Sequence, residues 1–236
     1  MNYSYDLHIH SCLSPCGDMD MTPNNIVNMA LLAGLDIIAV SDHNTARNLP
    51  AVLAVAKQAG LTVVPAIEAC SAEEVHLLCL FRRLEDALAC SDFLYEHLPP
   101  IRNKPDVFGE QIILDENDHP VGSLEKLLIN ALDLGIEPLL KEVRGFGGLV
   151  IPAHVDKSAY SILSNLGMIP QEYGFTCIEV KNPETFDTDF TGHIITDSDA
   201  HYLADIADPV HHLSLSEKSA AAVIDHLKAP ASLGLF

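Results

Sequence analysis

The stretch Asp6-Leu7-His8-Ile9-His10-Ser11 ends the first apolar segment of the chain, residues 3–9, and the interpretation of the fold begins there. Side chains alternate across a β-strand, so His8 and His10 project from the same face. Two imidazoles placed in this way can bind one metal cation. Near the other end the chain reads Asp199-Ala200-His201, a second pair of ligand-type residues with the same spacing. Together the two motifs predict a metal site to which both ends of the sequence contribute.

Strand-like and helix-like segments alternate on either side of these motifs. Helices are expected at 22–33, 49–59, 84–97 and 216–227, and Thr22, Pro23 and Gly34 mark the start and the end of the first. Repeated strand-then-helix order predicts an α/β fold with a parallel sheet and right-handed crossovers. The number of strands, about seven, suits a closed barrel. Apolar runs typical of buried strands lie at 3–9, 35–40, 61–67, 75–81, 149–153, 177–180 and 193–196.

Ligand-type residues follow most of these expected strands. Active sites of parallel α/β barrels lie at the carboxyl ends of the strands, where such side chains converge. His76 is the exception, because it stands near the start of its expected strand. Either that strand runs differently or its boundary is misplaced. The candidates at strand ends are His8, His10, His43, Glu68, His154, Asp199 and His201.

Residues 99–145 interrupt the alternation. The segment 111–121 has the pattern of a hairpin with a polar tip at 115–118. Two short helices are expected after it, at about 124–133 and 136–145. We therefore expect an inserted hairpin and helical segment on the barrel, in a position to cover the site.

Composition limits the class of protein and its partners. The chain has 236 residues, 48% of them hydrophobic, which is enough for one large domain with a substantial core. Its formal net charge is -20, with 13 Lys and Arg, so no extended nucleic-acid surface is expected. A small phosphorylated substrate remains compatible with this charge. No signal peptide or membrane-length apolar run is evident, and the six cysteines include no CxxC pair, so a cytoplasmic setting with free thiols is expected.

The motifs taken together resemble those of the PHP (polymerase and histidinol phosphatase) family, and the resemblance spans residues 3 to about 206. It implies a single PHP domain over 1–236 with a distorted (β/α)7, TIM-like barrel. It also implies a centre of three divalent cations and, in many members, hydrolysis of phosphate esters. The motifs are Asp6-Leu7-His8-Ile9-His10-Ser11, Val40-Ser41-Asp42-His43-Asn44, Ile67-Glu68, Glu74-Val75-His76, Pro152-Ala153-His154 and Ser198-Asp199-Ala200-His201.

The same resemblance implies a ligand set for each cation. Asp20 competes with Asp18, which is favoured because the family's Asp commonly precedes its Thr-Pro and Asp18 lies four residues before Thr22. Cys12 and Cys16 match no ligand position of the family and are expected to be ordinary thiols. Histidine and carboxylate ligands favour zinc, manganese or iron. The expected sets are His8, His10, Glu68 and Asp199 for the first cation, Asp18, His43 and His201 for the second, and Glu68 as a bridge, His76 and His154 for the third.

Basic and acidic residues near these motifs suggest further roles. Arg47, Lys157 and Lys181 are expected at the rim of the site as substrate-binding groups. Arg47 is favoured, also as a catalytic group beside the ligands, because its planar fork can bind two phosphate oxygens. Asp42 and Asp197 are expected to orient the rings of ligating histidines.

The leading functional hypothesis is a metal-dependent phosphoesterase. It would hydrolyse a small phosphorylated metabolite or nucleotide through a hydroxide that the metal centre activates. An amidohydrolase-type metal hydrolase is an alternative, because that superfamily also begins with an HxH motif on an α/β barrel. A second alternative is a catalytically silent metal-binding regulatory module.

Overall fold

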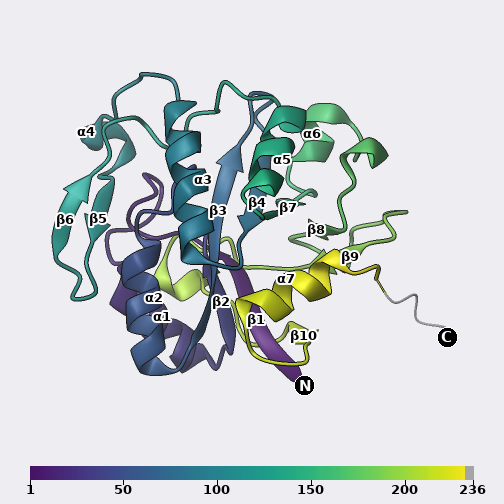
Figure 1. Cartoon of the computed structure of the whole chain (residues 1–236), viewed down its shortest axis with the longest axis horizontal. Helices are drawn as coiled ribbons and strands as arrows, with labels where there is room; N and C mark the ends of the chain where they lie inside the picture. Colours follow the sequence, from purple (N-terminus) through teal and green to yellow (C-terminus); the bar gives the residue numbers. More distant parts are fainter. Residues whose placement is uncertain (232–236) are drawn as a thin grey trace.

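A curled, mixed sheet forms the centre of the molecule (Figure 1). The structure is a computed structural model, and it describes residues 1–231. A separate parallel pair consists of β8 (Cys177–Glu179) and β9 (His193–Ile195). The strands of the main sheet, in spatial order, are β10 (His212–Ser214), β1 (Asn2–Ile9), β2 (Ile37–Val40), β3 (Thr62–Cys70), β4 (His76–Leu80) and β7 (Leu149–Pro152).

The directions of the strands correct the prediction of an all-parallel sheet. β1, β2 and β3 are parallel, but β4 is antiparallel to both β3 and β7, and β10 is antiparallel to β1. The register pairs Cys70, the last residue of β3, with His76, the first residue of β4. The start of β4 therefore lies at the carboxyl end of β3, which resolves the exceptional position of His76 in favour of a reversed strand.

Hydrogen bonds outside the named strands connect the two sheets. The backbone N–H of Val155 donates to the carbonyl of Glu179 (2.8 Å), which joins the end of β7 to β8. At the other side, the N–H of His10 donates to Ala200 O (2.9 Å), and Ile9 pairs with Ala200 in parallel. The sheet thus curls toward a barrel, and the prediction of an α/β, TIM-type fold is confirmed.

Helices lie around this sheet (Figure 1). Thr22 accepts a hydrogen bond from Asn25 N, and Gly34 ends the first helix in the left-handed conformation at φ 84°, as the sequence predicts. The short elements are α4 (Pro105–Phe108), α6 (Ile162–Leu166), η1 (Gln171–Tyr173) and η2 (Leu203–Asp205). The longer helices are α1 (Pro23–Ala33), α2 (Leu49–Ala59), α3 (Leu84–Glu96), α5 (Ile136–Gly145) and α7 (Ala220–Lys228).

Both faces of the central strands are buried. Ile38 and Val40 of β2 pack toward the large cluster that includes residues of α1, α2, α3 and α5. The alternate residues Ile37 and Ala39 belong to a second cluster that includes Val223 and other residues of α7. A strand buried on both faces requires a continuous apolar run, which is the pattern that the sequence has here. Among the described residues, no helix is both long and apolar enough to cross a bilayer.

The segment 99–145 contains one of the two predicted helices. The hairpin is present as β5 (Ile112–Leu114) and β6 (Pro120–Ser123), and α5 coincides with the helix expected at 136–145. The helix expected at 124–133 is wrong. The buried amide of Gln111 donates to Leu124 O (2.9 Å) and Lys126 O (2.8 Å), and its oxygen accepts from Leu128 N (2.9 Å). These bonds satisfy the backbone of the segment in an irregular conformation.

Candidate metal centre

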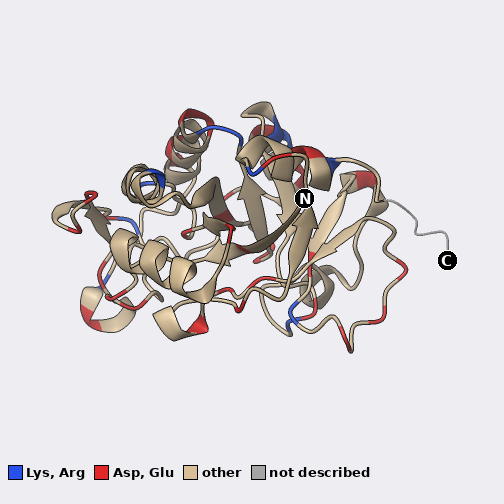
Figure 2. Cartoon of the chain, turned by 90° about the horizontal axis from the view of Figure 1, so that it is seen from below, with Lys and Arg blue, Asp and Glu red and all other residues tan. Residues whose placement is uncertain are grey.

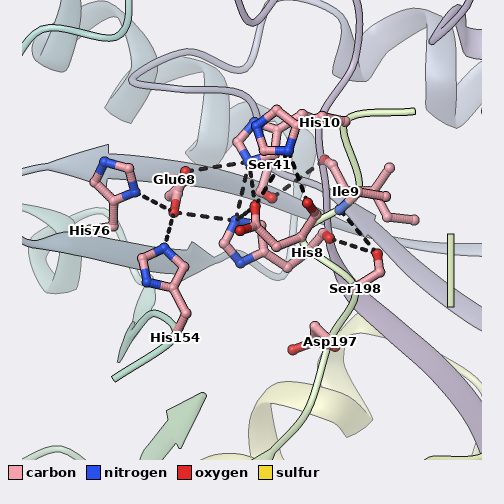
Figure 3. Close-up of polar contacts among 12 residues, drawn as sticks. His8, Ile9, His10, Ser41, Glu68, His76, His154, Asp197 and Ser198 are labelled. Carbon is pink, nitrogen blue, oxygen red and sulfur yellow. Dashed lines mark hydrogen bonds and ion pairs between the residues drawn. The ribbon is translucent and has the colours of Figure 1, made fainter. Parts of the chain in front are cut away.

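Five buried imidazoles surround the carboxylate of Glu68, which ends the apolar part of β3 (Figure 3). They come from β1, the loop after β2, the start of β4 and the loop after β7, so the strand ends converge as the sequence predicts. Glu68 itself is 1% exposed. Its Oε1 lies 2.8 Å from His76 Nδ1, 3.2 Å from His154 Nε2 and 3.3 Å from His8 Nε2, and its Oε2 lies 3.0 Å from His43 Nδ1 and 3.4 Å from His10 Nε2.

The surrounding rings control the charge of this carboxylate. Burial alone would raise the pKa of Glu68, but the neighbouring charges of His76, His8 and His43 outweigh burial and hold the pKa well below its usual value. Glu68 is therefore an anion at neutral pH. Because its two oxygens face different groups of histidines, it is suited to bridge two cations.

The nitrogen atoms of His8 and His10 face each other. Nδ1 of His8 lies 2.8 Å from Glu179 Oε2, and Nδ1 of His10 lies 3.0 Å from Ser14 Oγ. These contacts leave Nε2 of both rings turned toward Glu68, with the two Nε2 atoms 3.2 Å apart. Two nitrogen lone pairs at this distance repel each other unless a proton or a metal cation lies between them.

Asp42 supports His10 through an intermediate hydroxyl. Its Oδ1 accepts from Ser14 Oγ (2.7 Å) and from Ser11 N (2.8 Å). Since the Ser14 hydroxyl donates to Asp42, its oxygen is free to accept from Nδ1–H of His10. Asp42 thus acts on a ligating ring indirectly, in the orienting role expected of it.

Asp197 does not contact the ring of His8, and Glu179 takes that position instead. Oδ1 of Asp197 accepts from the backbone N–H of Leu7 (2.6 Å), so this carboxyl group stabilises β1. Burial, together with the charges of Glu179 and Asp6, raises the pKa of Asp197 well above its usual value. Glu179 was not predicted from the sequence, although it lies at the end of an apolar strand, as several predicted ligands do.

Asp199 completes the group around His8 and His10. Its Oδ1 lies 3.3 Å from His10 Nε2 and 3.5 Å from His8 Nε2. Burial alone would lower the pKa of His10, but hydrogen bonds to Asp199 and Glu68 raise it to about 9. A metal cation and a proton compete for the same nitrogen of a ligating histidine, so metal binding would release any proton held there. The structure brings together all four residues expected for the first cation.

His43 and His201 lie on the other side of His10. The ring of His201 stacks on that of His10 with centroids 4.3 Å apart, and its Nδ1 is 2.9 Å from Asp199 O. This bond leaves Nε2 of His201 as its free nitrogen. Burial and the neighbouring His10 lower the pKa of His201 to about 4, so the ring is neutral at neutral pH.

Asp18 is not brought into this second group. Its Oδ1 accepts from the backbone N–H of Asp20 (2.8 Å), within its own turn, and Asp20 is exposed. Among the described residues, three groups have ligand atoms within 4.8 Å of one another, and none of them includes Asp18. The group that contains both His43 and His201 also contains His10 and Cys16.

The donor set fits divalent cations. His43 Nδ1, Glu68 Oε2, His76 Nε2 and His154 Nδ1 are buried and make no hydrogen bond within the described part of the chain. Buried polar atoms are unfavourable unless a partner engages them, and the first two of these atoms lie 3.0 Å apart at the centre of the group. Imidazole and carboxylate donors of this kind bind zinc, manganese and iron.

Strained backbone conformations occur beside the ligands. His154 has φ 31°, Asp199 φ 51°, Tyr160 φ 55° and Asn44, which follows His43, φ 53°. Residues other than glycine adopt this region only when surrounding contacts enforce it, and such positions concentrate at functional sites. For Asn44 the contacts are clear, because its side chain donates to Leu128 O (2.8 Å) and accepts from Cys70 N (3.0 Å).

The centre opens into a cavity of about 480 Å³. Its wall includes His76, His154, Lys157 and Tyr160. Among the described residues of the segment 99–145, Ile129 alone lines this cavity. Burial alone would lower the pKa of Lys157, but its ion pair with Asp199 outweighs this and raises the pKa. Lys157 is therefore a cation at the rim.

The other two predicted basic residues have structural partners. Nζ of Lys181 donates to the backbone carbonyl of Ser198, beside a neighbouring cavity that Lys157 and Asp199 also line. Arg47 is exposed and pairs with Asp92 of α3. The structure does not bring Arg47 to the cavity, because the chain turns outward just before α2 begins.

The fold is similar to those of several solved structures. It resembles PfuEndoQ of Pyrococcus furiosus, described as a lesion-specific endonuclease, with a TM-score of 0.68 and 18% identity over 97% of this chain and 56% of that one. It thus spans little more than half of the endonuclease. It also resembles a protein of Bifidobacterium adolescentis assigned as a metal-dependent phosphoesterase (TM-score 0.59, 18% identity, 97% of both chains). An amidohydrolase of Chromobacterium violaceum is similar as well (TM-score 0.52, 15% identity, 92% and 93%).

At these identities the structural neighbours establish the fold alone. No curated protein matches the sequence. The family model of the PHP domain matches residues 6–140, which is more than half of the chain and includes the histidine motifs after β1 and β2, Glu68 and His76. The chain therefore belongs to the PHP domain family.

Proposed function

We propose that this protein is a metal-dependent phosphoesterase that hydrolyses a small phosphorylated metabolite or nucleotide. The observation that carries the proposal is the set of buried imidazoles around Glu68, open to a cavity whose rim holds the ammonium group of Lys157. Phosphate ester hydrolysis needs cationic groups beside the phosphoryl oxygens, and this arrangement supplies positions for them.

Three ligand groups would hold the cations. When bound, divalent cations neutralise charge on the phosphoryl group and lower the pKa of coordinated water. The side chains of this chain fix where the cations lie, and Glu179 and Ser14 keep the Nε2 atoms of His8 and His10 directed inward. The groups are His8, His10, Glu68 and Asp199; His43 and His201; and Glu68, His76 and His154.

Lys157 is proposed as the group that binds the substrate phosphate. It pairs with Asp199 at the edge of the cavity, so its ammonium group lies beside the expected cations. Tyr160 stacks on His76 with ring centroids 4.9 Å apart and lines the same cavity, where an organic leaving group would contact it. Binding cavities of small metabolites have volumes of about 300–1,000 Å³, a range that includes this one.

The distribution of charge favours a small substrate over a long polyanion. Asp and Glu occur along most of the visible loops and helices, whereas Lys and Arg are few and scattered in this view (Figure 2). With a formal net charge of -20, extended nucleic acid would be repelled outside the immediate site.

The decisive experiment is phosphate release from a panel of phosphomonoesters and nucleotides by protein loaded with zinc, manganese or iron. Metal-stripped protein and Glu68→Gln are the controls, and both should be inactive. Amide cleavage without phosphate release would instead support an amidohydrolase. Incision of DNA containing an abasic site would support an EndoQ-like nuclease. A metal-dependent rise in melting temperature with no turnover of any substrate would support a regulatory module.

A further inference from the structure

The loop between β1 and α1 brings a cysteine into the metal centre. The sulfur of Cys16 lies within 4.8 Å of the ligand nitrogens of His10, His43 and His201. Cys16 is partly buried and lines the cavity together with His43 and His201. The thiol thus faces the same small volume as three imidazoles.

The backbone of this loop is held so that residue 16, and not residue 18, points inward. Gly17 N donates to Ser14 O (2.8 Å), and Asp18 N donates to His201 O (2.9 Å). A Cβ atom on Gly17 would lie 2.3 Å from Ser11 O, so this tight turn admits only glycine. Asp18 therefore contacts the His201 segment through its backbone, while its carboxylate faces its own turn.

The neighbouring rings independently indicate a ligand. His43 is 4% exposed, and its Nδ1, which lies 3.0 Å from Glu68 Oε2, makes no hydrogen bond in the part of the chain that the structure describes. His201 uses Nδ1 for the carbonyl of Asp199, which leaves Nε2 unpaired with the backbone. A cation beside the Cys16 sulfur would engage these nitrogens.

We infer that Cys16 is a ligand of the second cation, together with His43 and His201, in the position that the family resemblance gives to Asp18. This inference rests on the metal centre invoked in the proposed function. On binding, the thiol releases its proton to solvent and the sulfur forms the bond to the metal. Sulfur and imidazole donors favour zinc, iron or cobalt over magnesium and manganese, which prefer oxygen. The second position is therefore selective for the softer cations.

Cobalt(II) substitution tests the inference without any substrate. Metal-free protein is titrated with cobalt, and absorption and bound cobalt per chain are measured for the wild type, Cys16→Ser, Cys12→Ser and Asp18→Asn. Cys12 is a matched control, because it lies in the same loop but is 1% exposed and does not line the cavity. A sulfur-to-cobalt charge-transfer band in the near ultraviolet is expected in the wild type, Cys12→Ser and Asp18→Asn. Cys16→Ser should lose the band and bind one cobalt fewer.

A second variant separates loss of the ligand from loss of the fold. Cys16→Asp should restore the cobalt stoichiometry without the charge-transfer band and should bind manganese more tightly than the wild type does. Iodoacetamide should alkylate Cys16 in the metal-free protein and react at least tenfold more slowly after zinc is added, as judged by peptide mass spectrometry. These readouts show that an unfolded Cys16→Ser protein is not the cause of a lost band.

The opposite results overturn the inference. If Cys16→Ser keeps the full cobalt stoichiometry and band while Asp18→Asn loses one cobalt, Asp18 is the ligand and Cys16 is an ordinary thiol. The proposed function would survive that result, because the centre would still be filled. If the wild type binds no cobalt, zinc or manganese, both the inference and the proposed function fail.

Discussion

Nδ1 of His8 lies 2.8 Å from Oε2 of Glu179, and both side chains are fully buried. Burial alone would lower the pKa of His8, but the charges of Glu179 and Glu68 outweigh it and raise the pKa well above the usual value. The contact fixes the ring so that Nδ1 carries a proton and Nε2 faces Glu68. A carboxylate behind a ligating imidazole increases its basicity and holds its orientation.

Glu179→Gln removes this charge while keeping the shape of the side chain. We expect metal affinity to fall roughly 10–100-fold, the usual effect of removing such a partner. Calorimetric titration of metal-free protein with zinc measures the change. Glu172→Gln, an exposed substitution in η1, is the control and should bind zinc like the wild type. Equal affinities for Glu179→Gln and the wild type would show that Glu179 does not orient a ligand.

Removal of metal should destabilise the protein. The Nε2 atoms of His8 and His10 lie 3.2 Å apart, so a cation bound by both nitrogens would relieve the repulsion between their lone pairs. Free zinc at 100 times its dissociation constant should add about 2.7 kcal/mol to the free energy of unfolding. Thermal melts with zinc and after chelation measure this difference.

Glu68→Gln provides the matched control for the same melts. Without the central anion the ligand groups lose their bridge, so zinc should shift the melting temperature of this variant far less than that of the wild type. A zinc-induced shift of equal size in both proteins would place the binding site elsewhere.

The sequence predicted the ligands better than the supporting residues, for a physical reason. His8, His43, Glu68 and His154 follow apolar strands, and any curled sheet brings the ends of such strands together. The antiparallel direction of β4 was not evident, because a short apolar run between β3 and α3 has the same pattern in either direction. His76 was the one sign of the reversal.

The course of the loops could not be predicted from the sequence, because it depends on individual contacts. Whether residue 16 or 18 of the loop after β1 points inward depends on the turn at Gly17 and on the bond from Asp18 N to His201 O. The direction of Arg47 likewise depends on its pairing with Asp92, far along the chain on α3. Spacing in the sequence carries no information on such contacts.

Substitution of Lys157 should lower activity strongly, whereas substitution of Arg47 should have little effect. If Lys157 binds the substrate phosphate, Lys157→Met should lower kcat/KM by about tenfold or more, the effect of losing one charged hydrogen bond. Arg47→Ala should change kcat/KM less than about twofold, since its exposed ion pair contributes about 0–1 kcal/mol to stability and does not reach the cavity. Steady-state phosphate release with the best substrate of the panel compares the two variants. A larger loss in Arg47→Ala would restore Arg47 as the phosphate-binding group.

Asn44 links the loop that carries His43 to two distant segments. Its side chain donates to Leu128 O (2.8 Å) and Asn130 O (3.0 Å) and accepts from Cys70 N (3.0 Å), at a buried position with φ 53°. Asn44→Ala leaves these backbone groups without partners. Alanine also has no side-chain group that could stabilise the backbone at this positive φ.

The free energy of unfolding of Asn44→Ala should fall by about 3 kcal/mol or more, since each buried group left unsatisfied costs roughly 1–3 kcal/mol. Urea unfolding of the metal-free protein gives this value without interference from ligand binding. Asn25→Ala is the control, because Asn25 is exposed and its side chain makes one bond, to Asp20 O (2.9 Å), so a change within about 0.5 kcal/mol is expected. If the two variants lose similar stability, the bonds of Asn44 do not hold the loop. In that case the backbone pairing with Glu68 and the bond from His43 N to Ser14 Oγ (3.2 Å) hold His43 in place.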